Sequence, residues 1–120
     1  MRTRNETGRL GEDLAVRFLE QDGYEVLDRN WYGPGGELDV VAYDPEEDAV
    51  VGVEVKTRRT GTYGTPHEAV TPRKVQRLRV LLAAWLAEHD VHADGVRLDL
   101  VAVELRPDGP PLVDHVESIG

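Results

Sequence analysis

Residues 36–58 read GELDVVAYDPEEDAVVGVEVKTR, in which two valine-rich runs flank an acidic turn. The runs over 37–43 and 49–57 are strand-like in composition, and the turn DPEED joins them. This pattern predicts an antiparallel β-hairpin. Because side chains alternate between the faces of a strand, Leu38, Val40 and Ala42 are expected to share one face, and the charged residues the other.

Two helical segments flank the hairpin. Residues from about 5 or 7 to 21 carry apolar side chains at helical spacing, with Glu12 at the edge of the apolar arc. This segment is followed by Gly23, which suits a left-handed helix cap. Thr71 and Pro72 are typical of a helix start, since threonine caps the first turn and proline fits the first helical position. A second helix is therefore predicted to about residue 88.

Further strands complete an α/β pattern. The run 24–31 has a polar mixture that suggests a sheet edge, and the run from about 96 to 105 predicts a strand after the second helix. The tail 106–120 holds three prolines and could add a short strand over 112–116. The order αβββαβ predicts one α/β domain over residues 1–120, with a mixed central sheet flanked by helices. Trp85 is expected in the core, and Arg97 and Asp99 as a structural ion pair.

Length and composition exclude several classes of protein. The chain has 120 residues, enough for one domain with a core, and no cysteine. Disulfides and thiolate metal sites are therefore excluded, and a reducing cytoplasm is compatible with the composition. No apolar run approaches the ~20 residues that span a bilayer, and the first ten residues lack an apolar signal core. We expect a soluble cytoplasmic protein with no membrane partner.

Charge is distributed unevenly along the chain. The net charge is −9, yet residues 56–79 hold seven basic residues and one acidic residue, so that segment is at +6 and the remainder at −15. The asymmetry predicts one positive face on an acidic body, which would attract DNA. A solvated basic helix is the alternative. The residues expected to contact nucleic acid are Arg58, Arg59, Tyr63, Arg73, Lys74 and Arg77.

Tyr63 lies in the glycine-rich loop TGTYGTP and could stack on a base or flank the active site, the alternative being a partly buried loop tyrosine.

The hairpin brings carboxylates from its two strands together. Asp39 lies seven residues before the midpoint near residue 46, and Glu54 lies eight residues after it, so both should reach nearly the same height on neighbouring strands. Glu37 and Lys56 lie two residues from them on the same faces. If these faces match, the four side chains form one charged cluster.

Such a cluster has more carboxylates than counter-charge. Neighbouring carboxylates raise one another's pKa unless a cation lies between them. Oxygen ligands of this kind suit Mg²⁺ or Mn²⁺, and Lys56 could hold an attacking water and offset charge on a pentavalent phosphorus. An exposed strand face with cross-strand salt bridges is the alternative.

Three motifs occur in order along the chain: GxxGE at 8–12, GELD at 36–39 and VEVKTR at 53–58. Together they resemble the YraN-like family of predicted bacterial endonucleases, which is similar to archaeal Holliday junction resolvases within the PD-(D/E)xK nuclease superfamily. The match runs from about residue 8 to 103 and includes Lys74 and the RLD of 97–99. Leu38 stands where the superfamily has proline, as is usual in resolvase-like members. The resemblance implies a restriction-endonuclease-like fold.

The resemblance also implies roles for single residues. Asp39 and Glu54 would bind Mg²⁺ or Mn²⁺ with help from the Val55 carbonyl, and Glu12 would be a further acidic ligand on the first helix. Lys56 would be the catalytic lysine. Glu37 supports this set from its place in the predicted charged cluster.

These observations lead us to expect a metal-dependent DNA endonuclease, selective for branched or single-stranded DNA, in repair or recombination. A homodimer is expected by likeness to the resolvases, with Val80, Leu81 and Ala84 as its face. A non-catalytic nucleic-acid-binding or protein-docking module on the same fold is the alternative, and metal-dependent cleavage separates the two.

Overall fold

The computed structural model describes residues 3–60, 68 and 70–120. Its elements follow the order predicted from the sequence, with a fifth strand in the tail. They are α1 (Arg4–Gln21), β1 (Glu25–Gly33), β2 (Gly36–Asp44), β3 (Ala49–Arg59), α2 (Pro72–Glu88), β4 (Gly95–Leu105) and β5 (Leu112–Val116). The α/β class and the αβββαβ order are confirmed.

The strands form one mixed sheet in the order β1-β2-β3-β4-β5. β3 and β4 are parallel, and the other neighbouring pairs are antiparallel. A parallel pair needs a crossover connection, which α2 supplies. β1 lies at the edge of the sheet, as its polar sequence predicted.

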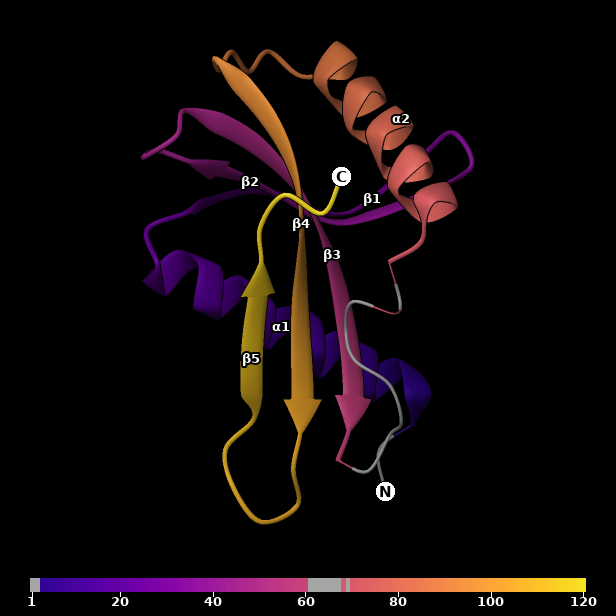
Figure 1. Ribbon diagram of the computed structural model, residues 1–120, viewed down its shortest axis with the longest axis vertical. Helices are drawn as coiled ribbons and strands as arrows, with labels where there is room; N and C mark the ends of the chain where they lie inside the picture. Colours follow the sequence, from indigo (N-terminus) through magenta and orange to yellow (C-terminus); the bar gives the residue numbers. More distant parts are fainter. Residues whose placement is uncertain (1–2, 61–67, 69) are drawn as a thin grey trace.

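The two helices cover opposite faces of the sheet (Figure 1). The core on the α1 side packs α1 against the valines of β3 and β4, and the core on the α2 side packs α2 against the other faces of β2, β3 and β4. Trp85 is 1% exposed in the α2 core, as predicted. No helix within the described ranges combines the length and the apolar character needed to cross a lipid bilayer.

Caps fix where the helices begin and end. The Thr71 side chain accepts the Lys74 N–H at 3.1 Å, which places Lys74 in the first turn of α2. Gly23 has a φ of 91°, and the Tyr24 N–H donates to the Leu19 carbonyl at 2.9 Å, closing the end of α1. Both caps agree with the sequence prediction.

The sheet opens between β2 and β3. Their pairing runs from Asp44–Ala49 only to Val40–Val53, whereas β3 stays paired with β4 to its last residue. Beyond Val40 and Val53 the β1–β2 hairpin and the β3–β5 strands diverge (Figure 1). Asp39 and Glu54 are the next residues after the last pair, so the prediction of equal height is confirmed.

The predicted alternation along β2 is wrong at one point. Val40 and Ala42 pack in the α1 core, but Leu38 packs in the α2 core. The alternation fails at Asp39 because β2 leaves β3 there, beside Asn30 of β1, whose φ is 52°. Glu37 consequently lies on the α1 side, opposite the face that β3 gives to Glu54 and Lys56.

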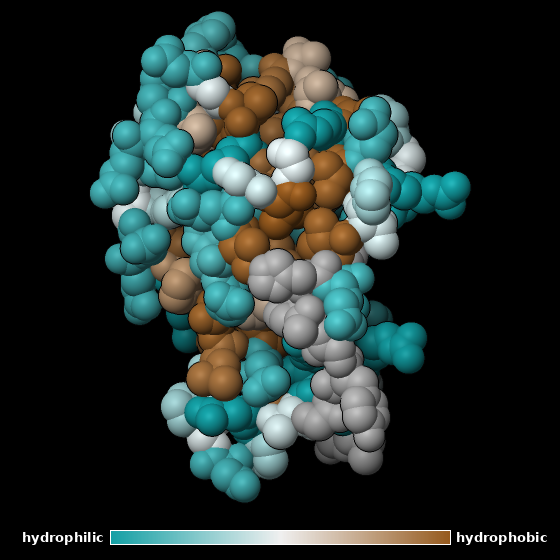
Figure 2. All heavy atoms as spheres, viewed as in Figure 1, coloured by the Kyte–Doolittle hydropathy of each residue, from teal (hydrophilic) through white to brown (hydrophobic). Residues whose placement is uncertain are grey.

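The expected dimer face on α2 also needs correction. Leu81 is 1% exposed because it packs into the α2 core, whereas Val80 is 48% exposed. Figure 2 shows apolar atoms (brown) over the middle of the face seen in Figure 1, between polar margins. A homodimer stays a prediction, and Leu81 cannot contribute to its surface.

Candidate functional site

Asp39 occupies the opening of the sheet. Its Oδ2 accepts the Val55 N–H at 2.8 Å. Val55 lies two residues beyond the last β2–β3 pair, so the carboxylate serves a backbone donor that β2 no longer meets. This bond fixes a half-buried carboxylate between the two diverging strands.

The surroundings of Asp39 disfavour its charged form. Burial, then the hydrogen bond and charge of Glu54, and more weakly the charge of Glu12, raise the pKa of Asp39 to about 8, although the Val55 N–H acts in the opposite direction. Two carboxyl groups this close cannot both ionise readily unless a cation joins them. The site therefore disfavours the simultaneous ionisation of Asp39 and Glu54.

Glu12 and Glu37 complete the acidic cluster, which we define as Glu12, Glu37, Asp39 and Glu54. Carboxylate oxygens of Glu12, Glu37 and Asp39 all lie within 4.8 Å of one another. Burial, and then the charge of Glu37, raise the pKa of Glu12. The residues of the cluster lie on α1, β2 and β3. Each of the three sequence motifs therefore contributes to one site.

A glycine in α1 sets the distance of Glu12 from the sheet. A Cβ at Gly11 would overlap the Thr57 hydroxyl of β3, so only glycine lets the helix approach this closely. Glu12, the next residue, is thereby brought to the opening of the sheet. This contact gives a physical reason for the glycine of the GxxGE motif.

Glu54 has its own counterion. Its Oε2 lies 3.0 Å from the Lys74 Nζ, with the two side chains 15% and 29% exposed. Lys74 of α2, which the hairpin pattern did not include, therefore offsets part of the charge of the acidic cluster. Lys56 is exposed, and in the described part of the chain it forms no ion pair. The chain has twelve arginines but only these two lysines.

The acidic cluster opens into a hollow of about 680 Å³, named here the basic hollow. It brings together Glu12, Asp39, Val55 and Lys56 with the predicted DNA contacts Arg58 and Arg59. The remaining lining residues are Arg4, Thr7, Gly8 and Thr57. Arg73 and Arg77 are exposed on α2 and do not line it. Tyr63 lies outside the described residues.

A second hollow, of about 540 Å³, lies on the β1 side of Glu12 and was missed from the sequence. We name it the tyrosine hollow. Its lining residues are Arg9, Glu12, Asp13, Arg29, Asn30 and Tyr32. The sequence could have predicted part of it. The glycine turn pairs Gly33 with Gly36, and the next pair along the two strands places Tyr32 opposite Glu37.

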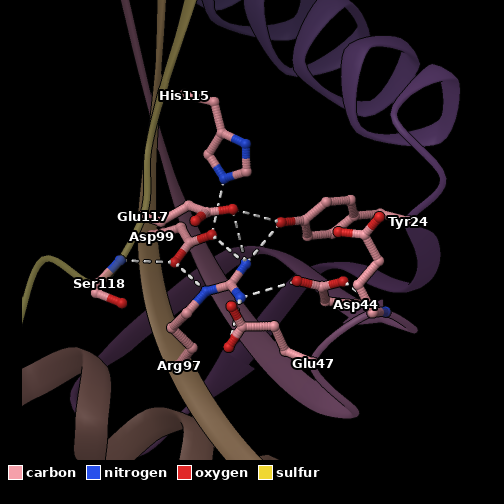
Figure 3. A network of polar contacts seen from close by, with 9 residues as sticks. Tyr24, Asp44, Glu47, Arg97, Asp99, His115, Glu117 and Ser118 are labelled. Atoms are coloured by element: carbon pink, nitrogen blue, oxygen red, sulfur yellow. Dashed lines mark hydrogen bonds and ion pairs between the residues drawn. The ribbon is translucent and has the colours of Figure 1, made fainter.

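A separate polar network joins β4 to its neighbours (Figure 3). Arg97 donates to both oxygens of the buried Asp99 at 2.9 Å, which confirms the predicted ion pair, and to Asp44 at 2.9 Å. His115 lies 2.7 Å from Asp99, and the Ser118 N–H donates to it at 3.1 Å. Asp99 and His115 are also close to Glu117, as metal ligands would be, but the guanidinium already holds both Asp99 oxygens. The network suits a structural role better than a metal.

Comparison with known proteins defines the family. A protein-family sequence model described as "Uncharacterised protein family UPF0102" matches residues 11–103. The matched segment runs from α1 through β4 and includes the acidic cluster. A UPF0102 protein of Beutenbergia cavernae is 51% identical over the full length of both chains, and one of Renibacterium salmoninarum 43% identical, also at full length. A UPF0102 protein of Pelobacter propionicus is 43% identical over 92% of this chain and 79% of its own. The chain therefore belongs to the UPF0102 family.

Proposed function

We propose that this protein is a metal-dependent nuclease that hydrolyses phosphodiester bonds in DNA. The observation that supports this most is the meeting of carboxylates from α1, β2 and β3 where the sheet opens, beside a hollow lined by Lys56, Arg58 and Arg59. Acidic groups would bind a metal ion and the basic ones a phosphate backbone. The choice of DNA, and of repair or recombination as its setting, rests on the resemblance to resolvases.

The donor atoms fit Mg²⁺ or Mn²⁺. Carboxylate oxygens of Glu12, Glu37 and Asp39 lie within 4.8 Å of one another, and Glu54 adjoins Asp39, so the cluster offers hard oxygen ligands. Burial and the neighbouring Glu54 both disfavour the charged form of Asp39, which a bound cation would favour. We assign Asp39, Glu12 and Glu54 as ligands with the Val55 carbonyl, and Glu37 as their support. When bound, the cation would polarise a phosphate oxygen and acidify a water molecule.

The lysines take different roles. Lys56 is exposed on the basic hollow, where its ammonium can hold the attacking water by hydrogen bonding and offset charge that develops on the phosphorus. Lys74 contacts Glu54 instead and fixes the orientation of that carboxylate. The lysine that acts on substrate is therefore Lys56, and Lys74 is a positioning residue.

The arginines serve binding more than sequence reading. Arg4, Arg58 and Arg59 line the basic hollow with Lys56, and a group of cations binds the phosphates of any sequence. Selectivity would then come from the shape of the DNA, as with branched or single-stranded substrates.

One observation favours a second candidate, a non-catalytic nucleic-acid-binding or docking module. The Lys74–Glu54 ion pair satisfies one carboxylate without any metal, as in a structural salt bridge. Such a module would bind DNA through the basic hollow but leave it intact.

A cleavage assay distinguishes the two candidates. The purified protein is incubated with labelled four-way junction, flap, single-stranded and duplex DNA in Mg²⁺, Mn²⁺ or EDTA. We expect cleavage of at least one substrate with metal only, and none by Lys56→Ala or Asp39→Asn. Arg106→Gln is a matched control, because Arg106 is an exposed cation that is bonded to the Pro110 carbonyl and lines neither hollow. Intact substrates throughout, or wild-type cleavage by Lys56→Ala, would contradict the proposal.

A further inference from the structure

The basic hollow and the tyrosine hollow meet at Glu12, which lines both. A strand whose phosphate lay at the acidic cluster would therefore extend into one hollow on each side. The two sides differ in chemistry. The basic hollow presents Arg4, Lys56, Arg58 and Arg59, whereas the tyrosine hollow presents an aromatic ring and an amide among fewer cations.

Tyr32 stands out within the tyrosine hollow. It is 76% exposed, more than the other exposed large hydrophobic side chains of the described residues. It is the cross-strand partner of Glu37, whose hydrogen bond and charge raise the pKa of the Tyr32 hydroxyl. The phenol thus lies beside the acidic cluster, while its ring remains open to solvent.

One of the two arginines of the tyrosine hollow is already paired with an acidic residue. Arg29 donates to Asp13 at 2.7 Å, which leaves Arg9 as the cation on that side with no ion pair in the described part of the chain. Asn30 adds an exposed amide, which can donate to and accept from the edge of a base. This side therefore suits a base better than a run of phosphates.

We infer that the tyrosine hollow binds an unpaired nucleotide next to the scissile phosphate, with its base stacked on the ring of Tyr32. The inference rests on the proposed function, since it places that phosphate at Glu12 and Asp39. A base inside a duplex has neighbours on both faces and offers none to Tyr32. The substrate is accordingly a nucleic acid with unpaired bases at the cleavage position, and Tyr32 is a specificity-determining residue.

The test measures binding without turnover. Fluorescence anisotropy in EDTA compares a labelled single-stranded oligonucleotide with the blunt duplex of the same sequence. Base–aromatic stacking predicts that Tyr32→Ala weakens single-strand binding by roughly 5- to 150-fold and leaves duplex binding unchanged. Tyr32→Phe should bind like the wild type, because it keeps the ring. Val96→Ala is the matched control, because Val96 is an apolar residue on β4 that is 60% exposed and lines neither hollow.

A second readout reports stacking itself. With 2-aminopurine placed at successive positions of the oligonucleotide, wild type and Tyr32→Phe should quench one position that Tyr32→Ala does not. Unchanged affinity and quenching in Tyr32→Ala would overturn the inference, as would an equal loss of duplex binding. If DNA is cleaved but Tyr32→Ala binds normally, only the stacking proposal fails. If nothing is cleaved but Tyr32-dependent binding persists, the nuclease proposal fails and the unpaired-nucleotide site stands.

Discussion

Asp39 is half-buried at the opening of the sheet, where it accepts the Val55 N–H and lies among three other carboxylates. A residue placed only for stability would be expected to have a base beside it. No basic side chain is among the groups that shift its pKa, and Lys74, which contacts the cluster from α2, is engaged with Glu54. The arrangement costs stability in the metal-free protein, which is the behaviour expected of a ligand.

The first prediction follows from that cost. The folded pKa of Asp39 is raised to about 8, mainly by burial and then by Glu54. An acid whose pKa is raised in the folded state destabilises the fold as pH rises above its unfolded pKa of about 4. The destabilisation is largest above the folded pKa and disappears as pH falls below the unfolded pKa. Asp39→Asn keeps an oxygen for Val55 and removes the charge. In EDTA it should therefore equal or exceed wild-type stability at neutral pH and above, and the advantage should vanish in acid.

Denaturant unfolding of both proteins across this pH range provides the measurement. If Asp39 instead pairs with a base, Asp39→Asn loses up to ~1 kcal/mol at neutral pH. Such a loss of stability would contradict the assignment of Asp39 as a metal ligand.

At the scale of elements, the close contact of α1 with β3 determines where Glu12 lies in the acidic cluster. Gly11→Ala should push α1 away from Thr57, because its Cβ would overlap the hydroxyl, and should cost about 1–3 kcal/mol as overpacking does. Cleavage should fall as well, since Glu12 moves with the helix. Gly8→Ala is the control: its Cβ meets nothing within 4 Å, so it should leave stability unchanged or raise it by up to ~1 kcal/mol. Equal behaviour of the two variants in thermal melts would contradict the role given to Gly11.

The Arg97 network holds β4 to β2, β5 and the start of β1. Asp99 is fully buried, yet hydrogen bonds from His115 and Arg97 outweigh that burial and lower its pKa. A lowered acid pKa gives stability that is present above the unfolded value of about 4 and is lost as pH falls through the folded pKa. Arg97→Met leaves Asp99 without its cation and should cost about 3–5 kcal/mol at neutral pH.

Chemical denaturation at neutral and acid pH checks this prediction. The gap between Arg97→Met and wild type should narrow in acid, where the unpaired Asp99 takes up a proton. A gap that is small at neutral pH, or that widens in acid, would show that the network contributes little to the fold.

Elements were predictable from the sequence where local chemistry fixes them. The Thr71 cap, the Gly23 end of α1 and the 36–58 hairpin all depend on neighbours in the chain. The break in alternation at Asp39 was not predictable, because it arises where β2 leaves β3, beside Asn30 of β1 with its φ of 52°. The Lys74–Glu54 contact depends on where the crossover helix lies, which no local pattern specifies.

At the scale of the whole molecule, binding DNA with a net charge of −9 requires a local positive field. The structure places Arg58 and Arg59 on the basic hollow and leaves Arg73 and Arg77 outside its lining. Replacing Arg58 and Arg59 by glutamine should flatten the dependence of log affinity on log salt by about one for each phosphate that the protein no longer neutralises. Replacing Arg73 and Arg77 should change the slope less. Anisotropy titrations at several salt concentrations test this, and the reverse ranking would place the DNA face on α2.

The central claim is that the acidic cluster is a metal site, and a thermal melt with and without Mn²⁺ tests it most directly. Binding to the folded state should stabilise the wild type by about 1.4 kcal/mol at tenfold over Kd, because stabilisation follows RT ln(1+[L]/Kd). Asp39→Asn should lose most of that gain while being at least as stable as the wild type in EDTA. A metal-insensitive wild type together with a destabilised Asp39→Asn would contradict the account.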